Sequence, residues 1–264
     1  MDHTVSALIP CYEMAHCVAR AVRSVLDQEG DAVEVVVVDD GSKADPREAL
    51  AQFGDRVRLV RQDNAGAAAA RNRAAAEARG EWLAFLDADD RWVPQKTRLT
   101  LAALERRPAA RFAYGQALGI GEHGARKVLG TPRPGLAMEG DVLLSVLRTG
   151  NMIPMTTGVV HRDAFFAVGG LDESLRSGED YDLWIRLAER FEAAYVPEPL
   201  CIYRMHAGGD VMGDLDRWVR SCDRIHERLL ERHPADGEIA DAVALTHAAI
   251  RLSRGQDRLL LGDR

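Results

Sequence analysis

The chain has 264 residues, of which 47% are hydrophobic, enough for one large domain or one domain with a helical addition. Its 41 acidic residues against 34 lysines and arginines give a net charge of -7, which argues against a nucleic-acid binder because such proteins present a basic surface. No apolar stretch approaches the roughly 20 residues that a membrane-spanning helix needs.

The first 110 residues alternate between short apolar runs and stretches with helical periodicity. Strands that alternate with helices favour right-handed crossovers, and therefore a mostly parallel sheet flanked by helices. In chain order, the expected elements are a strand at Val5–Pro10, a helix at Ala15–Gln28, a strand at Val33–Asp39, a helix opened by Asp45-Pro46, a strand at Val57–Val60, a helix at Ala67–Arg79, a strand at Trp82–Asp87 and a helix at Pro94–Arg107.

The second half of the chain has a weaker pattern. Glycine and proline are frequent between Arg111 and Gly140, which predicts irregular strands and loops. From about Leu215 the pattern is helical to the end, with an interruption near His233-Pro234. Between these regions we expect a short helix at Glu139–Leu147, a strand at Thr156–His161, an amphipathic helix at Asp180–Arg190 and a strand at Leu200–Tyr203.

The cysteines and the first residues bear on the cellular compartment. None of the four cysteines forms a Cys-x-x-Cys pair, so neither a zinc site nor a disulfide framework is expected, and they suit buried positions in a reducing compartment. Met1-Asp2-His3-Thr4 lacks the basic region of a signal peptide. We therefore expect a cytoplasmic protein, with room for peripheral contact at the inner face of the membrane.

Two acidic clusters each follow a long apolar run. The run Val35–Val38 leads into Asp39-Asp40, and the run Trp82–Leu86 leads into Asp87-Ala88-Asp89-Asp90. Unbroken apolar runs are typical of strands buried on both faces, and ligands of open α/β sheets gather at the carboxyl ends of such strands. Clustered carboxylates repel one another, so the pattern favours a site for a cation or a hydroxyl-rich ligand.

A set of motifs in order resembles the family 2 glycosyltransferases with the GT-A fold. Each motif alone is weak, but the ordered set, which covers roughly residues 4 to 206, is specific. The chain departs from the family pattern at Glu13, where Asn is usual, and at Ala74, where Gly is common. The motifs are Ile9-Pro10-Cys11-Tyr12, Val38-Asp39-Asp40-Gly41-Ser42, Asn64-Ala65-Gly66 with Ala70-Arg71-Asn72, Gly80-Glu81-Trp82 running into Leu86-Asp87-Ala88-Asp89-Asp90, Gly178-Glu179-Asp180, and Tyr203-Arg204-Met205-His206.

The resemblance implies the fold class and the domain plan. The fold class is α/β, with a Rossmann-like, mostly parallel central sheet flanked by helices and a C-terminal helical extension. Residues 1–210 would form the GT-A domain, with a nucleotide-sugar-binding half at 1–110 and an acceptor half at 111–210. Residues 211–264 would form the helical extension.

The resemblance also implies the donor contacts. Pro10 and Tyr12 would hold the nucleotide base, and Asp39 would accept a hydrogen bond from it. Arg71 would reach the diphosphate, since guanidinium offers a fixed fork of donors to phosphate. Ala88 would lie against the donor between the two acids of the Asp-x-Asp motif. For Asp40 a turn and capping role is at least as good an interpretation as ligand contact.

A divalent cation, Mn²⁺ or Mg²⁺, is the implied cofactor. Asp87 would meet the ribose or a metal-bound water, and Asp89 would bind the metal directly. His206 is a further candidate contact to the metal or the diphosphate, and Arg204 a candidate contact to phosphate. We expect Asp90 to cap the following turn.

The resemblance assigns catalysis to Glu179-Asp180. Asp180 would be the general base that takes a proton from the acceptor hydroxyl while its oxygen attacks the anomeric carbon in one inverting displacement. Its place at a helix N-terminus predicts a lowered pKa. Capping is the simpler alternative for an acid there, and Asp182 is the reserve candidate. Trp92 and Trp184 are interpreted as core residues in preference to an acceptor groove.

The implied function is metal-assisted transfer of a hexose-type sugar from a nucleoside diphosphate, UDP most commonly, to a hydroxyl of a glycan, lipid-linked or small-molecule acceptor. A homo-oligomer is left open.

The alternative function is that of a degenerate member of the family that binds sugar nucleotide without turnover. Phosphatases with Asp-x-Asp place the motif after the first strand, nucleotidylyltransferases need a glycine-rich loop there, and dinucleotide oxidoreductases need Gly-x-Gly-x-x-Gly, so all three fit poorly.

Overall fold

A computed structural model describes residues 4–30, 32–121, 124–205 and 215–261. Its first half is a parallel sheet with strand order β3-β2-β1-β4. The strands are β1 (Val5–Cys11), β2 (Glu34–Asp40), β3 (Val57–Gln62) and β4 (Trp82–Phe85), and the helical segments between them are α1 (Val18–Leu26), α2 (Arg47–Leu50), the 3-10 helix η1 (Ala51–Arg56) and α3 (Ala67–Glu77). These elements confirm the predicted alternation.

The apolar runs form strands because both faces of the sheet are covered. Val35 and Val37 of β2 pack in one cluster with residues of α1, while Val36 and Val38 pack in a second cluster with alanines of α3. The alanines let α3 lie close to the strands, and Ala74 is fully buried among them. The residue that replaces the family's usual glycine is thus accommodated by the core.

The second half extends the same sheet beyond β4 in the order β8-β6-β9-β5, with β7 paired to β6. β8 runs antiparallel to β4 and β6, and β6 runs parallel to β9. The elements are β5 (Arg91–Trp92), α4 (Lys96–Arg106), β6 (Ala110–Ile120), β7 (Arg126–Leu129), α5 (Leu143–Thr149), η3 (Met155–Thr157), β8 (Val159–His161), α6 (Arg162–Ala167), α7 (Glu179–Ala188) and β9 (Glu192–Arg204).

The long strands β6 and β9 correct the predicted irregular region and the predicted short strand at Leu200–Tyr203. A Cβ on Gly115 would lie 2.7 Å from the Val196 carbonyl oxygen and 2.7 Å from the Leu200 side chain, both on β9. The glycine therefore permits close approach of two central strands instead of forming a loop. The predicted strand at Thr156–His161 is shorter because its first residues form the 3-10 turn η3.

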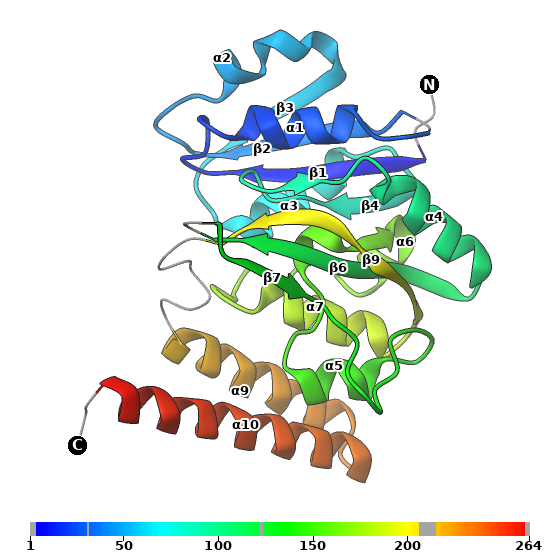
Figure 1. Cartoon of the computed structure of the whole chain (residues 1–264), viewed down its shortest axis with the longest axis vertical. Helices are drawn as coiled ribbons and strands as arrows, with labels where there is room; N and C mark the ends of the chain where they lie inside the picture. Colours follow the sequence, from blue (N-terminus) through cyan, green and yellow to red (C-terminus); the bar gives the residue numbers. More distant parts are fainter. Residues whose placement is uncertain (1–3, 31, 122–123, 206–214, 262–264) are drawn as a thin grey trace.

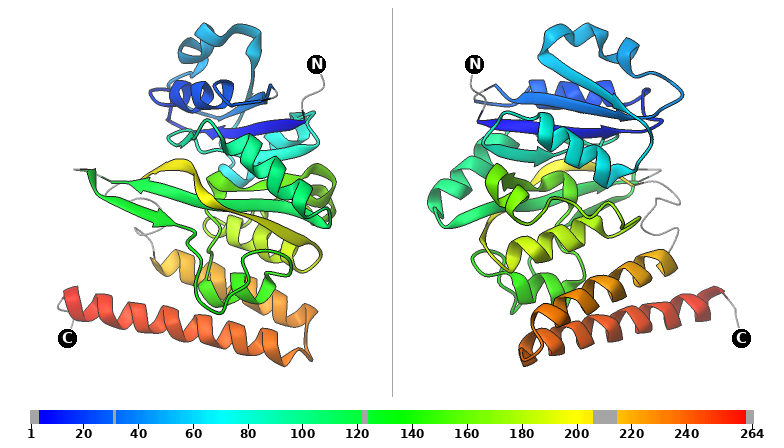
Figure 2. Two further views of the ribbon diagram at one scale, coloured as in Figure 1. Left: turned by 45° about the vertical axis from the view of Figure 1, so that its right-hand side comes forward. Right: turned by 180° about the vertical axis from the view of Figure 1, so that it is seen from behind.

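Two C-terminal helices, α9 (Leu215–Arg232) and α10 (Gly237–Leu261), lie side by side at the end of the molecule remote from α1 and α2, beneath α5 and α7 (Figures 1 and 2). The predicted break at His233-Pro234 falls between them. Ile225 and Leu229 of α9 and Val243 of α10 belong to the main hydrophobic core, so the pair packs as part of the domain. Among the described residues, no helix is long and apolar enough to cross a membrane.

The centre of the core is the indole of Trp184. The side chain is fully buried and stacks on Phe112 with ring centroids 6.2 Å apart. Gly158 lies against the same indole, where a Cβ would come within 2.4 Å of a ring carbon. Trp92 is also buried, so the prediction that both tryptophans are core residues is confirmed.

We predict that Gly158→Ala lowers the free energy of unfolding by about 1–3 kcal/mol, the usual cost of overpacking, because neither the indole nor the backbone has room to move. Chemical denaturation measures the change. Gly237→Ala is the matched control, since a Cβ there meets nothing within 4 Å and the residue opens α10. Equal stability of the two variants would contradict the packing around Trp184.

Candidate active site

The acidic residues after β4 form a turn at the carboxyl edge of the sheet. The Leu86 N–H donates to the Leu8 carbonyl of β1, and the Asp90 N–H donates to the Asp87 carbonyl, which closes the turn. Asp87 and Asp89 remain partly accessible to solvent, whereas Asp90 is buried. The turn thus presents two carboxylates at the edge and keeps a third beneath them.

Arg71 joins this turn to the helix that carries the expected base. The guanidinium, on α3, donates to Asp87 Oδ1 at 2.6 Å and to Glu179 Oε1 at 3.0 Å. Only 5% of Arg71 is exposed. Burial opposes its charge, but the two carboxylates outweigh burial and raise the pKa of Arg71 above its ordinary value. Arg71 therefore stays charged and ties together two motifs that are far apart in the sequence.

Asp180 lies beside this bridge on the first turn of α7. Its Oδ2 accepts a hydrogen bond of 2.8 Å from the Asn151 side-chain amide, and its Oδ1 accepts one of 2.8 Å from the Tyr181 N–H. Burial, with the charge of Glu179 adding to it, raises the pKa of Asp180 to about 6. The expectation of a lowered pKa was wrong because desolvation outweighs the helix dipole.

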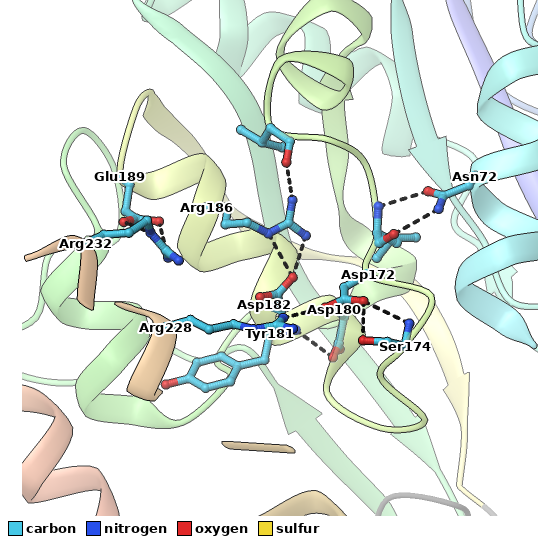
Figure 3. A network of polar contacts seen from close by, with 12 residues as sticks. Asn72, Asp172, Ser174, Asp180, Tyr181, Asp182, Arg186, Glu189, Arg228 and Arg232 are labelled. Atoms are coloured by element: carbon cyan, nitrogen blue, oxygen red, sulfur yellow. Dashed lines mark hydrogen bonds and ion pairs between the residues drawn. The ribbon is translucent and has the colours of Figure 1, made fainter. Parts of the chain in front are cut away.

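Asp182, the reserve candidate, is engaged elsewhere. Its Oδ2 accepts from Arg186 one turn along α7, at 2.8 Å from Nε and 2.5 Å from Nη2, and the residue is buried (Figure 3). This ion pair gives Asp182 a structural role within the helix.

The end of β2 holds the two acids of the first cluster in different environments. Asp39 is buried, and its carboxylate accepts from Arg61 at 2.8 Å and from the Ser42 N–H at 3.1 Å. Asp40 accepts from the N–H groups of Ala65 and Gly66 at 2.9 and 2.8 Å, immediately before α3. Asp40 thus holds the loop that leads into α3 without capping the helix, and its choice between a turn role and a ligand contact stays a prediction.

The loop after β1 places an aromatic ring next to this edge. The Glu13 N–H donates to the Ser42 hydroxyl and Glu13 Oε1 accepts from the Lys43 N–H, which joins the loops that follow β1 and β2. Tyr12 is 49% exposed, while Pro10 is partly buried at the strand end. Glu13, where the family usually has Asn, thus contributes a loop contact.

The sequence predicts that Asp90 caps the following turn, but in the structure Asp90 binds a different partner. Its Oδ1 accepts from the Arg204 N–H at 2.8 Å, which fastens the end of β9 to the acidic turn. Burial and the charge of Asp87 raise the pKa of Asp90 well above its usual range. Three acids within four residues signal a crowded site, but the partner from β9 is more than 100 residues away, so sequence alone could not reveal it.

A cavity of about 270 Å³ adjoins Asp89. Arginines from α1, β5 and β9 line it, and within the described part of the chain their side chains form no ion pair. Such a cavity suits an anion. Arg20 and Arg91 have no sequence signal, because separate elements bring them here. The lining residues are Arg20, Asp89, Arg91, Ile120, Gly121, Ile202, Arg204 and Met205.

The donor set fits a divalent cation only in part. Asp87 and Asp89 offer carboxylate oxygens, which Mg²⁺ and Mn²⁺ prefer. Burial raises the pKa of Asp90 and the nearby charge of Asp87 adds to this effect, so the acids of the turn lie close together. No group of three metal-ligating side chains is preformed among the residues in the described ranges. Phosphate oxygens of a ligand would therefore have to complete the coordination. His206 lies outside the described residues.

Comparison with known proteins finds glycosyltransferases similar to this chain. A family model described as glycosyl transferase family 2 matches residues 6–152. An uncharacterised glycosyltransferase of Haemophilus influenzae is 29% identical over 232 residues, which cover 86% of this chain and 77% of the relative. One from Rickettsia conorii is 30% identical over 82% of this chain, but the match spans only 35% of that longer protein.

A shorter match is an Escherichia coli enzyme, UDP-Glc:alpha-D-GlcNAc-diphosphoundecaprenol beta-1,3-glucosyltransferase, which is 35% identical over 43% of this chain and 46% of the enzyme. Among solved structures, Staphylococcus aureus TarS 1-349 with UDP-GlcNAc aligns with a TM-score of 0.71 and 18% identity, over 90% of this chain and 69% of TarS. The mannosyltransferase PcManGT of Pyrobaculum calidifontis, in complex with GDP-Man and Mn²⁺, aligns at 0.67 and 18%, over 94% and 69%. Both have the GT-A fold.

The raised pKa of Asp180 makes its ionisation unfavourable to folding. Since the pKa is about 6 in the folded state and about 3.9 unfolded, the stability present below pH 4 is lost as the pH rises to 6. We predict that Asp180→Asn, which cannot ionise, gains about 1–3 kcal/mol relative to the wild type between pH 4 and pH 7. Denaturant unfolding at both pH values measures this gain. Asp241→Asn, the same charge change at an exposed position on α10, should show no such rise.

Proposed function

Because the chain belongs to glycosyl transferase family 2, we propose that it is an inverting enzyme that moves a sugar from a nucleoside diphosphate to an acceptor hydroxyl, assisted by a divalent cation. One observation carries the proposal, the buried Arg71 bridge from Asp87 to Glu179. It brings the Asp-x-Asp turn and the Glu179-Asp180 pair into one site, as transfer between a bound donor and an activated acceptor requires.

The nucleotide would bind at the ends of β1 and β2. Tyr12 offers an exposed ring face for a base. Asp39 lies at the strand end, and a base would have to share its buried carboxylate with Arg61 and the Ser42 N–H. The comparisons include proteins that bind UDP-GlcNAc and GDP-Man, and one whose name specifies UDP-Glc. We favour UDP, the commoner donor nucleotide in the family.

The diphosphate would lie by Asp87 and Asp89. In a bound complex, Mn²⁺ or Mg²⁺ held by these carboxylates would neutralise charge on the departing diphosphate. Arg91 and Arg204, beside Asp89, would add fixed positive charge to the same region. Arg71 would keep the Asp87 carboxylate oriented, since it already donates to Oδ1.

Asp180 would act as the general base. With a pKa of about 6 it is mostly ionised at neutral pH, yet it is more basic than an ordinary aspartate. It takes the proton of the acceptor hydroxyl while that oxygen bonds to the anomeric carbon. The bond from this carbon to the phosphate oxygen breaks on the opposite face, so the configuration inverts and the nucleoside diphosphate leaves.

The acceptor would be a glycan, a lipid-linked glycan or a small molecule. The Escherichia coli relative is named for a diphosphoundecaprenol-linked acceptor, which makes lipid-linked glycans the first class to test. Binding of the donor without transfer to any acceptor would instead support the alternative, a catalytically degenerate protein.

Calorimetric titration with UDP, GDP and dTDP, each with Mn²⁺ and with chelator, tests the donor site. We predict metal-dependent binding of one nucleotide, weakened at least tenfold, about 1.4 kcal/mol, in Asp89→Ala. Asp241→Ala, on the exposed face of α10, should bind as the wild type does. If no nucleotide binds to the wild type under any condition, the assignment of Asp39, Asp87 and Asp89 is wrong.

Replacement of the base separates binding from transfer. We predict that Asp180→Asn binds the donor nucleotide normally but transfers about 10²–10⁴-fold more slowly, the usual contribution of general-base catalysis. Asp182→Asn is the matched control on the same helical turn, and it should retain transfer because Asp182 pairs with Arg186. If Asp182→Asn lost transfer and Asp180→Asn kept it, the base would be Asp182.

A further inference from the structure

The C-terminal helices lie directly behind the turn that carries Asp180. Gly178, the residue before α7, has its Cα facing α9, where an added Cβ would meet Ser221 and Ile225 at 3.6 Å. Cys222 of α9 is fully buried, and burial raises the pKa of its thiol, with smaller contributions from the charges of Asp223 and Asp180. Helix α9 therefore packs behind the turn that carries the candidate base, and α9 lies outside residues 6–152, which the family model matches.

A first hydrogen-bonded link joins α7 to both helices. Tyr181 Oη lies 2.9 Å from His226 Nε2 of α9, and His226 Nδ1 lies 2.8 Å from His247 Nε2 of α10. Tyr181 and His226 are both fully buried. Burial raises the pKa of Tyr181 and lowers that of His226 to about 4, so at neutral pH a phenol hydroxyl meets a neutral imidazole. The residue next to Asp180 is thus anchored to α9.

A second link runs through the end of α5. The Thr246 hydroxyl of α10 donates to the Leu147 carbonyl in the last turn of α5. Gly150 ends that helix, and a Cβ added there would meet Thr246 at 3.6 Å and Trp218 at 3.7 Å. The next residue, Asn151, has a φ of 80°, a left-handed conformation that is unusual outside glycine. In this conformation its side-chain amide donates to Asp180 Oδ2.

From these contacts we propose that the α9–α10 pair positions the Asp180 carboxylate, with Tyr181–His226 and Asn151 as the two positioning contacts. This inference rests on the proposed function in taking Asp180 as the base. The two contacts act on different atoms: one holds the backbone of the first turn of α7, and the other orients the carboxylate itself. A general base must hold its carboxylate at a defined distance and angle from the acceptor hydroxyl, which requires both a fixed backbone and an oriented side chain.

Other contacts of α9 reach α7 and the loop before it without touching Asp180. Arg232 forms an ion pair with Glu189 at 2.8 Å, and Arg228 forms one with Asp172 at 2.6 Å (Figure 3). They attach the same helix to the same domain, so they offer controls for a merely structural effect.

The variants Tyr181→Phe and Asn151→Gly test the proposal. The first removes only a hydroxyl, and the second removes the amide while allowing the positive φ. We predict that each lowers kcat for transfer roughly tenfold to 100-fold, with donor KM and calorimetric nucleotide affinity within twofold of the wild type. Arg232→Gln, which loosens α9 elsewhere, should leave kcat within twofold even if it lowers Tm. Equal loss of kcat in all three variants, or in none, would overturn the proposal.

A pH profile gives a readout that loss of structure would not imitate. Because the Asn151 amide favours the ionised form of Asp180, Asn151→Gly should move the acid limb of the kcat profile to higher pH, while Arg232→Gln should not. If the wild type transfers no sugar, the proposed function has failed, but the positioning contact can still be read. Asp180 ionisation lowers the unfolding free energy over a pH range whose upper limit is the folded-state pKa of Asp180, and comparison with Asp180→Asn in the same background measures that limit. The upper limit should be higher in Asn151→Gly than in the wild type, and an unchanged limit would refute the contact.

Discussion

A buried arginine between two carboxylates holds the candidate site together. Arg71 reaches from α3 to Asp87 at the end of β4 and to Glu179 at the start of α7, and it is nearly inaccessible to solvent. A buried charge is tolerated only when it is paired, so each of the three elements depends on the other two for its position. Asp40 supports this arrangement, since it accepts hydrogen bonds from the loop that leads into the helix carrying the arginine.

Acidic and basic side chains crowd the same edge of the sheet. Arg71 compensates Asp87 and Glu179, but Asp90 and Asp180 lie in the same region, and burial raises the pKa of each. Buried acids with raised pKa values are frequent at functional sites, and here Arg20, Arg91 and Arg204 line a cavity beside Asp89. Carboxylates suited to a cation thus lie next to arginines suited to an anion, as the proposed donor site requires.

The C-terminal helices pack directly against the elements that carry the candidate base. Their side chains fill the core beneath α7, and His226 and Thr246 reach the segments on either side of Asp180. A side chain at a helix terminus keeps a fixed position only if the elements that pack against that terminus are themselves fixed. Variation in such an appendage could therefore tune turnover without change in any residue that touches the donor.

By itself, the sequence determined the alternating sheet and helices of the first half, the family, and the residue types at the strand ends, because apolar period and motif order are local properties. It could not assign β6 and β9 as long central strands, since Gly115 signals a loop until the neighbouring strand is known. Only the tertiary structure decided that Arg71 bridges two acids, that Asp90 holds β9, and that Asp180 has a raised pKa. Each of these depends on burial and on partners distant in the chain, and no local pattern encodes them.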